Sequence, residues 1–423
     1  MEKIITPVKG TREFYPYEMA VRNWIYQNIR YVSELFGYAE YDGPFLESID
    51  LYAAKSGEEL VKEQSFVFPD RGGNLITLRP ELTPSLARMV AQRQRQLIYP
   101  LRWWSFGPFW RYEKPQKGRT REFFQWNIDL IGTHTPEADA ELIAIAAEFL
   151  KQIDLTPEKV KIFVNDRQLM DLKLSEIGID SSLLKNALKI IDRRDKMRSD
   201  SWKEFALELG LTEEQFSELS KILANKELYK ESPNLVKVFS TLENMGIKEY
   251  VEYDPMIVRG LDYYTGIVFE ARDVGKRSRA ILGGGRYDNL VNDLGGDPLT
   301  GIGFAMGDVV LPIILDEYKL LPAMIINPAI ILVTIFDAET TSTSVSTASE
   351  LRKAGIPVQL FPEAAKLGKQ FKFADRNGIR YAVVIGPDEI KEGIVQVKDM
   401  QTREQVTVKS KDLISYFKGL LAV

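Results

Sequence analysis

The alternation of apolar and polar residues near the start of the chain predicts one amphipathic helix followed by a series of strands. Residues 17–36 place apolar side chains three or four positions apart, and Gly37 then ends the predicted helix. Residues 65–80 predict a strand, a glycine turn and a second strand, and two longer strands are expected at 102–113 and 122–132. Antiparallel strands with few helices between them indicate an α+β fold rather than a doubly wound one.

The pattern changes further along the chain. Residues 166–248 are charged and helical in period, which indicates a helical insertion between residues 1–165 and 249–322, the two parts of one strand-rich domain. After a proline-bounded linker, strands and helices alternate over residues 329–423. We therefore expect a compact C-terminal α/β module with a mainly parallel sheet.

Composition then limits the chemistry. The 55 Lys and Arg residues against 60 Asp and Glu give a net charge of −5, so any nucleic-acid binding must come from local patches. No cysteine is present, which excludes disulfides and thiol nucleophiles. The single histidine, His134, precedes a predicted helix with Thr135 as N-cap and Pro136 as first residue. We expect an ordinary loop residue there, because no second histidine could complete a metal site.

Targeting and nucleotide motifs are also informative. The first residues lack an apolar leader and no stretch of about 18 apolar residues occurs, so we expect a cytoplasmic protein without membrane association.

Neither a phosphate-binding GxxxxGK[ST] loop nor a GxSxG nucleophile motif is present. The segment GIGFAMG at 301–307 has one residue too many for GxGxxG. A nucleotide would therefore bind here by other means.

The predicted strand at 122–132 carries an unusual polar row. Because side chains alternate along a strand, one face holds a ring, two amides and a carboxylate, namely Phe123, Gln125, Asn127 and Asp129. The upstream strand places Arg111 and Glu113 on one face near its end. A solvated face of an edge sheet would show the same alternation, but the neighbouring charges favour the floor of a binding site.

Two further segments carry candidate binding residues. The connecting loop KPQKGRTR holds four basic residues without an acid, namely Lys114, Lys117, Arg119 and Arg121. Such a loop is usually only solvated, but beside Arg111 it favours a contact with phosphate or nucleic acid. Three glycines at 283–285 precede Arg286 and Tyr287; they either let the backbone lie against a ligand or bend the chain between strand and helix.

The segment VRGLDYYTGIVFE, from Val258 to Glu270, gathers the most chemistry in the shortest space. A strand is predicted after Gly266, and a core strand has no use for the polar residues before it, namely Arg259, Asp262, Tyr263 and Tyr264. A pocket for a ligand that is both charged and ring-shaped would need such residues.

These segments, in this order, resemble those of the class II aminoacyl-tRNA synthetases, and specifically of the histidyl-tRNA synthetase family. The resemblance rests on LRPELT, WRYEKPQKGRTREFFQ, VRGLDYYTG, GGGRYDNLV and GIGFAMG, and it runs from KGTREFYP at 9–16 to the end of the chain. The C-terminal VVIGPDEIKEGIVQVKDM is similar to the family's anticodon-binding domain. The resemblance implies a catalytic domain on an antiparallel sheet, interrupted by a helical insertion and followed by an α/β anticodon-binding domain.

The resemblance also implies an activity and roles for individual residues. The chain would activate histidine with ATP and transfer it from histidyl-adenylate to tRNA(His). Arg111 and Arg259 would hold the α-phosphate, and Arg119 would reach the γ-phosphate. Glu113 would contact the adenine amino group and Phe123 would stack on the ring. Mg²⁺ would bridge the outer phosphates with few protein ligands, so no metal-binding residue is assigned.

Histidine recognition needs one acceptor and one donor, since a neutral imidazole offers one of each. By resemblance, Asp129 accepts and Tyr264 donates. The remaining pocket residues implied are Glu81, Thr83 and Gln125 around the α-amino group, with Tyr263 and Tyr287 lining the walls. Lys114 and Gln116 are expected near the acceptor end of the tRNA. The segment GYAEYDGPFLE, with Pro44, resembles the family's dimer-forming motif, so we expect a homodimer.

Four positions depart from the family pattern. Val310 stands where the third class II motif carries an arginine over ATP, and Arg286 is a candidate to compensate. Asp129 replaces a common glutamate, Tyr112 a histidine and Leu82 a glycine. These departures leave a second hypothesis open, a catalytically silent paralogue that binds histidine as a regulatory subunit of histidine biosynthesis. A scaffold built from synthetase parts is a third, although it does not explain the charged pocket residues.

Overall fold

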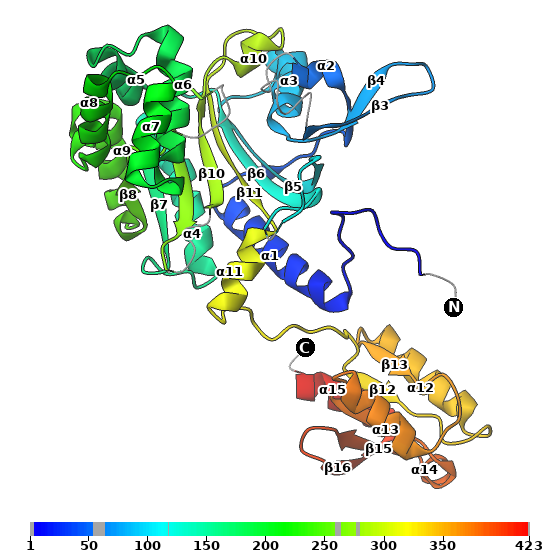
Figure 1. Ribbon diagram of the computed structural model, residues 1–423. Coiled ribbons are helices and arrows are strands. Elements are labelled where there is room, and N and C mark those ends of the chain that lie inside the picture. The colour runs from blue at the N-terminus through cyan, green and yellow to red at the C-terminus, as the bar shows by residue number, and fades with distance from the viewer. Residues whose placement is uncertain (1–3, 54–63, 117, 259–263, 276–279, 422–423) are drawn as a thin grey trace. The chain divides into compact units, whose positions relative to one another are not determined.

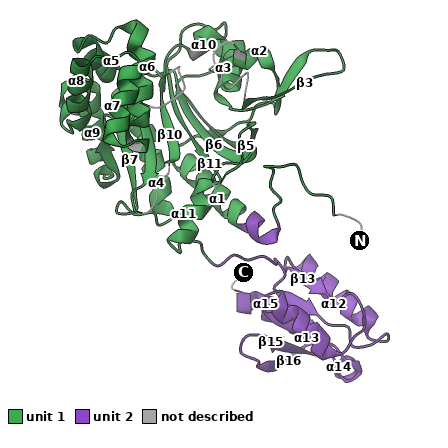
Figure 2. Cartoon of the chain, in the orientation of Figure 1, with its two compact units in different colours: residues 1–14, 21–322 green, residues 15–20, 323–423 purple. Residues whose placement is uncertain are grey.

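The chain forms two compact units, one made of residues 1–14 and 21–322 and the other of residues 15–20 and 323–423 (Figure 2). The computed structural model describes residues 4–53, 64–116, 118–258, 264–275 and 280–421. Its first helix, α1 (Pro16–Leu35), confirms the helix predicted at 17–36. Within these ranges no helix has the length and apolarity needed to cross a membrane.

An eight-stranded sheet forms the centre of the larger unit (Figure 1). In spatial order its strands are β1 (Ala39–Glu40), β5 (Leu101–Trp110), β6 (Glu122–Ile131), β11 (Gly301–Gly307), β10 (Ala280–Tyr287), β9 (Ile267–Asp273), β7 (Val160–Asp166) and β8 (Val251–Tyr253). Neighbours from β5 through β7 pair antiparallel, whereas β1 pairs parallel with β5 and β8 with β7. The predicted α+β class with an antiparallel central sheet is confirmed.

The β5–β6 hairpin is the longest pair of the sheet and sets its faces. Its register runs from Leu101 opposite Ile131 to Trp110 opposite Glu122. β5 ends at Trp110, so the predicted strand at 102–113 is too long by three residues. Arg111 still donates its backbone N–H to the Arg121 carbonyl at 2.9 Å, which keeps the two chains together just past the strand.

Helices cover the apolar face of this sheet. The Trp126 ring lies 5.1 Å from Phe149 of α4 (Pro136–Gln152), and Trp104 lies 6.0 Å from Tyr26 of α1. Burial of such rings contributes about 1.5–3 kcal/mol per large side chain, so this face anchors the sheet. α4 begins as predicted, because the Thr135 side chain accepts the Ala138 N–H at 3.3 Å and Pro136 follows.

The polar row of β6 points to the opposite face, beside a second group of elements. These are the helices α2 (Ile49–Ala53), α3 (Thr83–Arg93) and α10 (Leu290–Asp293), and a small antiparallel sheet of β2 (Leu46–Ser48), β4 (Leu75–Leu78) and β3 (Phe66–Pro69). Helix α11 (Val310–Glu317) follows β11 and is drawn beside α1, away from this group (Figure 1). The β3–β4 hairpin predicted at 65–80 is confirmed, with Phe66 opposite Leu78. Gly73 adopts φ +87° in its turn, a conformation that favours glycine.

Five helices connect β7 to β8 and form a cluster at one side of the sheet (Figure 1). They are α5 (Arg167–Glu176), α6 (Ser181–Arg193), α7 (Ser199–Glu208), α8 (Glu213–Ala224) and α9 (Pro233–Asn244). Side chains of Asp180, Thr212 and Ser232 cap the starts of α6, α8 and α9. The buried Trp202 donates its indole N–H to the Ile190 carbonyl at 2.8 Å, which ties α7 to α6.

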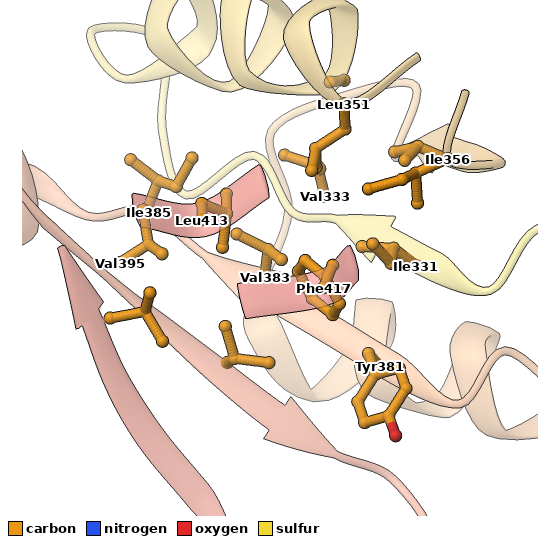
Figure 3. Packing of buried hydrophobic residues seen from close by; sticks show 14 residues of the cluster. Ile331, Val333, Leu351, Ile356, Tyr381, Val383, Ile385, Val395, Leu413 and Phe417 are labelled. Atoms are coloured by element: carbon orange, nitrogen blue, oxygen red, sulfur yellow. The ribbon is translucent and has the colours of Figure 1, made fainter. Parts of the chain in front are cut away.

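The smaller unit is an α/β layer structure. Its sheet has the order β13 (Val358–Leu360), β12 (Ile331–Val333), β14 (Tyr381–Val384), β15 (Ile394–Asp399) and β16 (Gln405–Lys409). Its helices are α12 (Thr341–Lys353), α13 (Leu367–Arg376), α14 (Pro387–Glu392) and α15 (Leu413–Leu421). Figure 3 shows its core, where Val333, Val383, Leu413 and Phe417 pack together between sheet and helices.

The prediction of a mainly parallel sheet in this unit is wrong. β12 pairs parallel with β13 and β14, but β14 pairs antiparallel with β15, and β15 with β16. The connections explain the difference. A parallel crossover needs about a dozen residues or more, and the links from β14 to β15 and from β15 to β16 are too short for one.

Candidate active site

Two adjoining cavities lie on the polar face of the large sheet. The larger holds about 230 Å³ and the smaller about 60 Å³, and Arg111 and Gln125 line both of them. β6 forms the shared floor, because Phe123, Gln125, Asn127 and Asp129 alternate onto this face as the sequence predicts. A single strand therefore connects the two cavities.

Small residues on the neighbouring strand create the space above this floor. Gly307, Ala305 and Gly303 of β11 lie opposite Gln125, Asn127 and Asp129, in that order. A Cβ atom on Gly303 would collide with the Asp129 carboxylate. Glycine at 303 is therefore required for Asp129 to adopt its observed position.

The smaller cavity brings together most of the residues predicted to bind histidine. Its described lining includes Glu81, Thr83, Gln125, Asn127, Asp129, Tyr264 and Tyr287. Glu81 and Thr83 come from the start of α3, Tyr287 from the end of β10, and the others from β6 and the segment before β9. Asn127 was placed on the correct face by alternation but was not assigned to the site, so the period of the strand was the signal that could have included it.

Asp129 and Tyr287 form a buried pair at the base of this cavity. The Tyr287 hydroxyl donates to Asp129 Oδ1 at 2.6 Å, and the two residues are only 4% and 2% exposed. Burial raises the pKa of Asp129 to about 7, and the hydrogen bond from Tyr287 partly opposes that shift. Burial likewise raises the pKa of Tyr264, so its hydroxyl stays protonated. The cavity thus offers Asp129 as an acceptor whose charge depends on pH, and the Tyr264 hydroxyl as a donor.

Gln125 stands at the junction of the cavities. Its Oε1 atom is buried and accepts no hydrogen bond from the part of the chain that the structure describes. An unpaired buried amide oxygen costs about 1–3 kcal/mol, and a ligand N–H placed there would remove that cost. The position therefore suits recognition of an amino group.

The larger cavity is built around Arg111 and Phe123. Arg111 donates its Nε–H to the Pro80 carbonyl at 2.9 Å, which orients the rest of its guanidinium fork. Its Cζ lies 5.4 Å from the centre of the Phe123 ring, and Phe123 stacks on Phe109 with ring centres 5.9 Å apart. A fixed cation beside a supported ring suits a ligand with a phosphate and an aromatic base.

Glu113 and Arg119 close the outer side of this cavity. Arg119 Nη1 lies 3.3 Å from Glu113 Oε2, and their side chains are 64% and 18% exposed. Lys114 and Gln116 are exposed in the same loop, where Gln116 and Arg119 exchange backbone hydrogen bonds of 2.9 and 3.1 Å. Neither Lys114 nor Gln116 lines either of these two cavities.

The inner wall of the larger cavity is apolar. Val310 lines it together with Val309, Gly307, Ile281 and Ala280. No arginine lies at this wall among the lining residues that the structure describes. The apolar contribution of Val309 and Ile281 was missed from the sequence, where only the loss of an arginine at 310 was noticed.

Arg286 does not compensate for Val310, and that hypothesis is wrong. Its Nε and Nη2 atoms lie 2.9 and 2.6 Å from Asp139 Oδ1, and Nη1 donates to the Thr133 carbonyl at 3.0 Å. Arg286 is 4% exposed, and burial raises the pKa of Asp139 to about 6 despite this pair. Its fork is committed to α4, so it holds β10 in place.

Three sequence predictions need separate mention. Arg259 and Tyr263 lie outside the described residues. His134 is an exposed loop residue as expected, with Nδ1 3.9 Å from Asp288 Oδ1. Among the described residues, no group of three Asp, Glu or His side chains could hold a metal ion. The residues around the larger cavity therefore fit Mg²⁺ only if phosphate oxygens and water supply most of its ligands, which is how Mg²⁺ usually binds nucleotides.

A mainly antiparallel sheet that carries two adjoining polar cavities on one face is the architecture of a class II aminoacyl-tRNA synthetase. The chain is thus an aminoacyl-tRNA ligase. Family models agree: histidyl-tRNA synthetase matches residues 10–308, and an anticodon binding domain matches residues 329–420. The chain belongs to the histidyl-tRNA synthetase family.

Individual relatives support this assignment. The chain is 38% identical to the Arabidopsis thaliana histidine–tRNA ligase, chloroplastic/mitochondrial, over 97% of this chain and 86% of that protein. A crystal structure of histidyl-tRNA synthetase from Nostoc sp. PCC 7120 covers 99% of this chain and 100% of its own, with TM-score 0.83 and 25% identity. A structure from Bacillus halodurans, titled an ATP phosphoribosyltransferase regulatory subunit/histidyl-tRNA synthetase, covers 88% of this chain and 97% of its own. At 21% identity and TM-score 0.73 it shows the shared fold alone.

Proposed function

We propose that the smaller cavity binds histidine and the larger one ATP, so that the chain makes histidyl-adenylate and then charges tRNA(His). The observation that supports this most directly is the sharing of Arg111 and Gln125 by both cavities. A shared wall brings an amino acid carboxylate and a nucleotide phosphate to the same place, which is what activation requires. Most of the rate enhancement then comes from positioning and charge neutralisation.

In the proposed first step, a histidine carboxylate oxygen attacks the α-phosphorus of ATP. A new P–O bond forms, the bond to the β-phosphate oxygen breaks, and pyrophosphate leaves with the electron pair. Arg111 and Arg259 would neutralise the charge on the α-phosphate, since a planar guanidinium matches phosphate oxygens in geometry. In the second step a ribose hydroxyl oxygen of the tRNA attacks the acyl carbon and forms an ester bond. The bond from the acyl carbon to the phosphate oxygen breaks, AMP leaves with its electron pair, and the hydroxyl proton is released to solvent.

The nucleotide roles follow from the larger cavity. Phe123 would stack on adenine, Glu113 would accept from its amino group and Arg119 would reach the γ-phosphate. Glu113 and Arg119 lie 3.3 Å apart, so both roles require the triphosphate to fold back toward the base. Mg²⁺ would neutralise the outer phosphates, held mainly by the nucleotide and water.

The histidine roles follow from the smaller cavity. Asp129 would accept from one imidazole nitrogen, with Tyr287 holding its carboxylate, and Tyr264 would donate to the other. Glu81, Thr83 and Gln125 would surround the α-amino group, and Tyr263 would complete the wall. An amino acid without these nitrogens would leave buried groups unpaired, a penalty that can reach about 10⁴-fold in selectivity.

The deciding experiment is histidine-dependent ATP–pyrophosphate exchange, with the other amino acids as controls. Exchange with histidine alone is the expected result. Histidine binding without exchange would favour the regulatory paralogue, and exchange with another amino acid would contradict the assignment of the smaller cavity.

Partners and organisation are proposed on the same basis. Residues 166–248 would be an insertion within a catalytic domain made of 1–165 and 249–322, and 329–423 the anticodon-binding domain. Lys114 and Gln116 would meet the tRNA acceptor end. A cytoplasmic location remains a prediction from the sequence.

We also propose a homodimer formed through the segment at 37–47. Large apolar side chains on this segment and the adjoining small sheet are 41–53% exposed, namely Phe45, Leu46, Phe68 and Leu75. A dimer interface through this segment would cover these side chains. Light scattering across the micromolar range should give twice the 48.2 kDa chain mass, and a monomer mass throughout would refute the dimer.

A further inference from the structure

The turn that carries the apolar wall of the larger cavity is fixed from the far side of the sheet. Asp308 lies between Gly307 and Val309, which line that cavity, but its own side chain contacts residues on the face covered by α1. We propose that Arg12 and Asp308 are positioning residues that set the distance between the two walls of the nucleotide cavity. This inference rests on the proposed nucleotide role of the cavity.

The contacts of Asp308 link three separate segments. Arg12 Nη2 donates to both Asp308 carboxylate oxygens, at 2.9 Å each. The Phe124 backbone N–H donates to Asp308 Oδ1 at 2.8 Å, and the Asp308 N–H returns a bond of 2.8 Å to the Phe124 carbonyl. The side chain thus ties the start of the chain to β6 and to the turn before α11.

These bonds hold the two walls at once. Phe124 stands between Phe123 and Gln125, which line one side of the larger cavity, and Asp308 stands between residues that line the other. Because Asp308 bonds both backbone atoms of Phe124, the two walls cannot separate without breaking a buried carboxylate network. A change in that network would reach the cavity through the backbone of each wall.

The charges around Asp308 make this network obligatory. Asp308 is 4% exposed, and burial raises its pKa while Arg12, the Phe124 N–H and Arg22 oppose the shift. Arg22 lies 4.3 Å over the Phe124 ring, and Arg12 lies 4.8 Å over Phe14. A buried carboxylate without its partner is strongly unfavourable, so loss of Arg12 would force this turn to rearrange.

The Arg12–Asp308 network lies directly behind the apolar wall of the larger cavity. The turn presents Val309 and Val310 to the cavity, and aliphatic side chains cannot attract a nucleotide from a distance by charge. Such a wall works only by close packing, which falls off within about 1 Å of displacement. A rigid turn, fixed from behind by Arg12, would therefore supply the precision that a cation at position 310 would otherwise provide.

The test uses Arg12→Gln, Asp308→Asn and the double variant in the full chain. ATP–pyrophosphate exchange gives KM for ATP and for histidine separately, and thermal unfolding reports the folded fraction. Arg102→Gln is the matched control, since Arg102 of β5 makes a bidentate pair of 2.8 and 3.0 Å with Glu141 of α4 and lines neither cavity.

We expect each single variant to raise KM for ATP about 10- to 100-fold, the range that a small misplacement can cause. The double variant should raise KM for ATP no more than the more impaired single variant does, because each single substitution already removes the same Arg12–Asp308 interaction. KM for histidine should stay within about twofold, and Arg102→Gln should leave both constants unchanged.

Two results would overturn the inference. One is folded Arg12→Gln and Asp308→Asn protein with the ATP constant of the unmodified chain. The other is an equal rise in both constants that Arg102→Gln reproduces, which would indicate general destabilisation. If the unmodified chain shows no exchange, the proposed function fails separately; calorimetric titration with ATP then decides, because unchanged ATP affinity in the variants overturns the inference and weakened affinity supports it.

Discussion

The two cavities share a floor but are built on opposite principles. In the smaller one Glu81, Asp129 and Tyr287 are at most 4% exposed, and the hydrogen bond between the last two is already formed. In the larger one the Arg119 side chain is 64% exposed and its partner Glu113 sits at the rim. Under the proposed roles, the histidine site has its internal hydrogen bond formed before the ligand arrives, whereas the ATP site leaves its outer groups to be ordered by the ligand.

The largest effect should come from the residue that both cavities share. Arg111→Ala removes the cation proposed to neutralise the α-phosphate, so exchange should fall about 10³-fold while thermal stability changes little. Exchange within tenfold of the unmodified chain would remove Arg111 from the proposed neutralisation of the α-phosphate. Arg259→Ala should abolish exchange in the same way.

Asp129→Asn tests whether the smaller cavity is the selective one. The amide presents the wrong donor to the imidazole, so kcat/KM for histidine should fall about 100-fold, with KM for ATP within about twofold. In the ligand-free protein the same variant should unfold at a higher temperature at pH 8, because it no longer buries a charge. Equal losses for histidine and ATP would erase the proposed division between the cavities.

Tyr287→Phe sharpens the comparison through pH. The Tyr287 hydroxyl stabilises the ionised form of Asp129, so its removal should raise the pKa of Asp129 above about 7. In the unmodified chain kcat/KM for histidine should rise with pH as Asp129 ionises. The variant should lose about tenfold at pH 7 and recover part of it at higher pH. An unshifted profile would remove Tyr287 from control of Asp129.

The smallest effect is expected at the open rim. Arg119→Ala breaks an exposed ion pair and one proposed phosphate contact, so KM for ATP should rise only about two- to fivefold. Added salt should reduce the difference between the variant and the unmodified chain, since exposed charges are screened. A loss as large as that of Arg111→Ala would mean that the rim is ordered in the working enzyme.

Local patterns predicted the parts of the fold that local physics controls. The helix at the start, the β3–β4 hairpin and the Thr135 cap were all predicted from spacing and turn residues. The mixed sheet of the smaller unit was not, because strand direction depends on how long each connection is rather than on the strand itself. The hypothesis that Arg286 compensates for Val310 was wrong for a similar reason. Its buried partner Asp139 lies on α4, far away in sequence.

The sequence by itself determined which side chains face the site. Alternation along 122–131 puts Phe123, Gln125 and Asp129 on one face whatever else the chain does. Only the tertiary structure decided what those groups become. Burial and the Tyr287 hydroxyl set the pKa of Asp129, and Arg12 reaches Asp308 across 296 positions of sequence. Pairing of strands and packing of helices, rather than local spacing, control such contacts, because they depend on how distant segments meet.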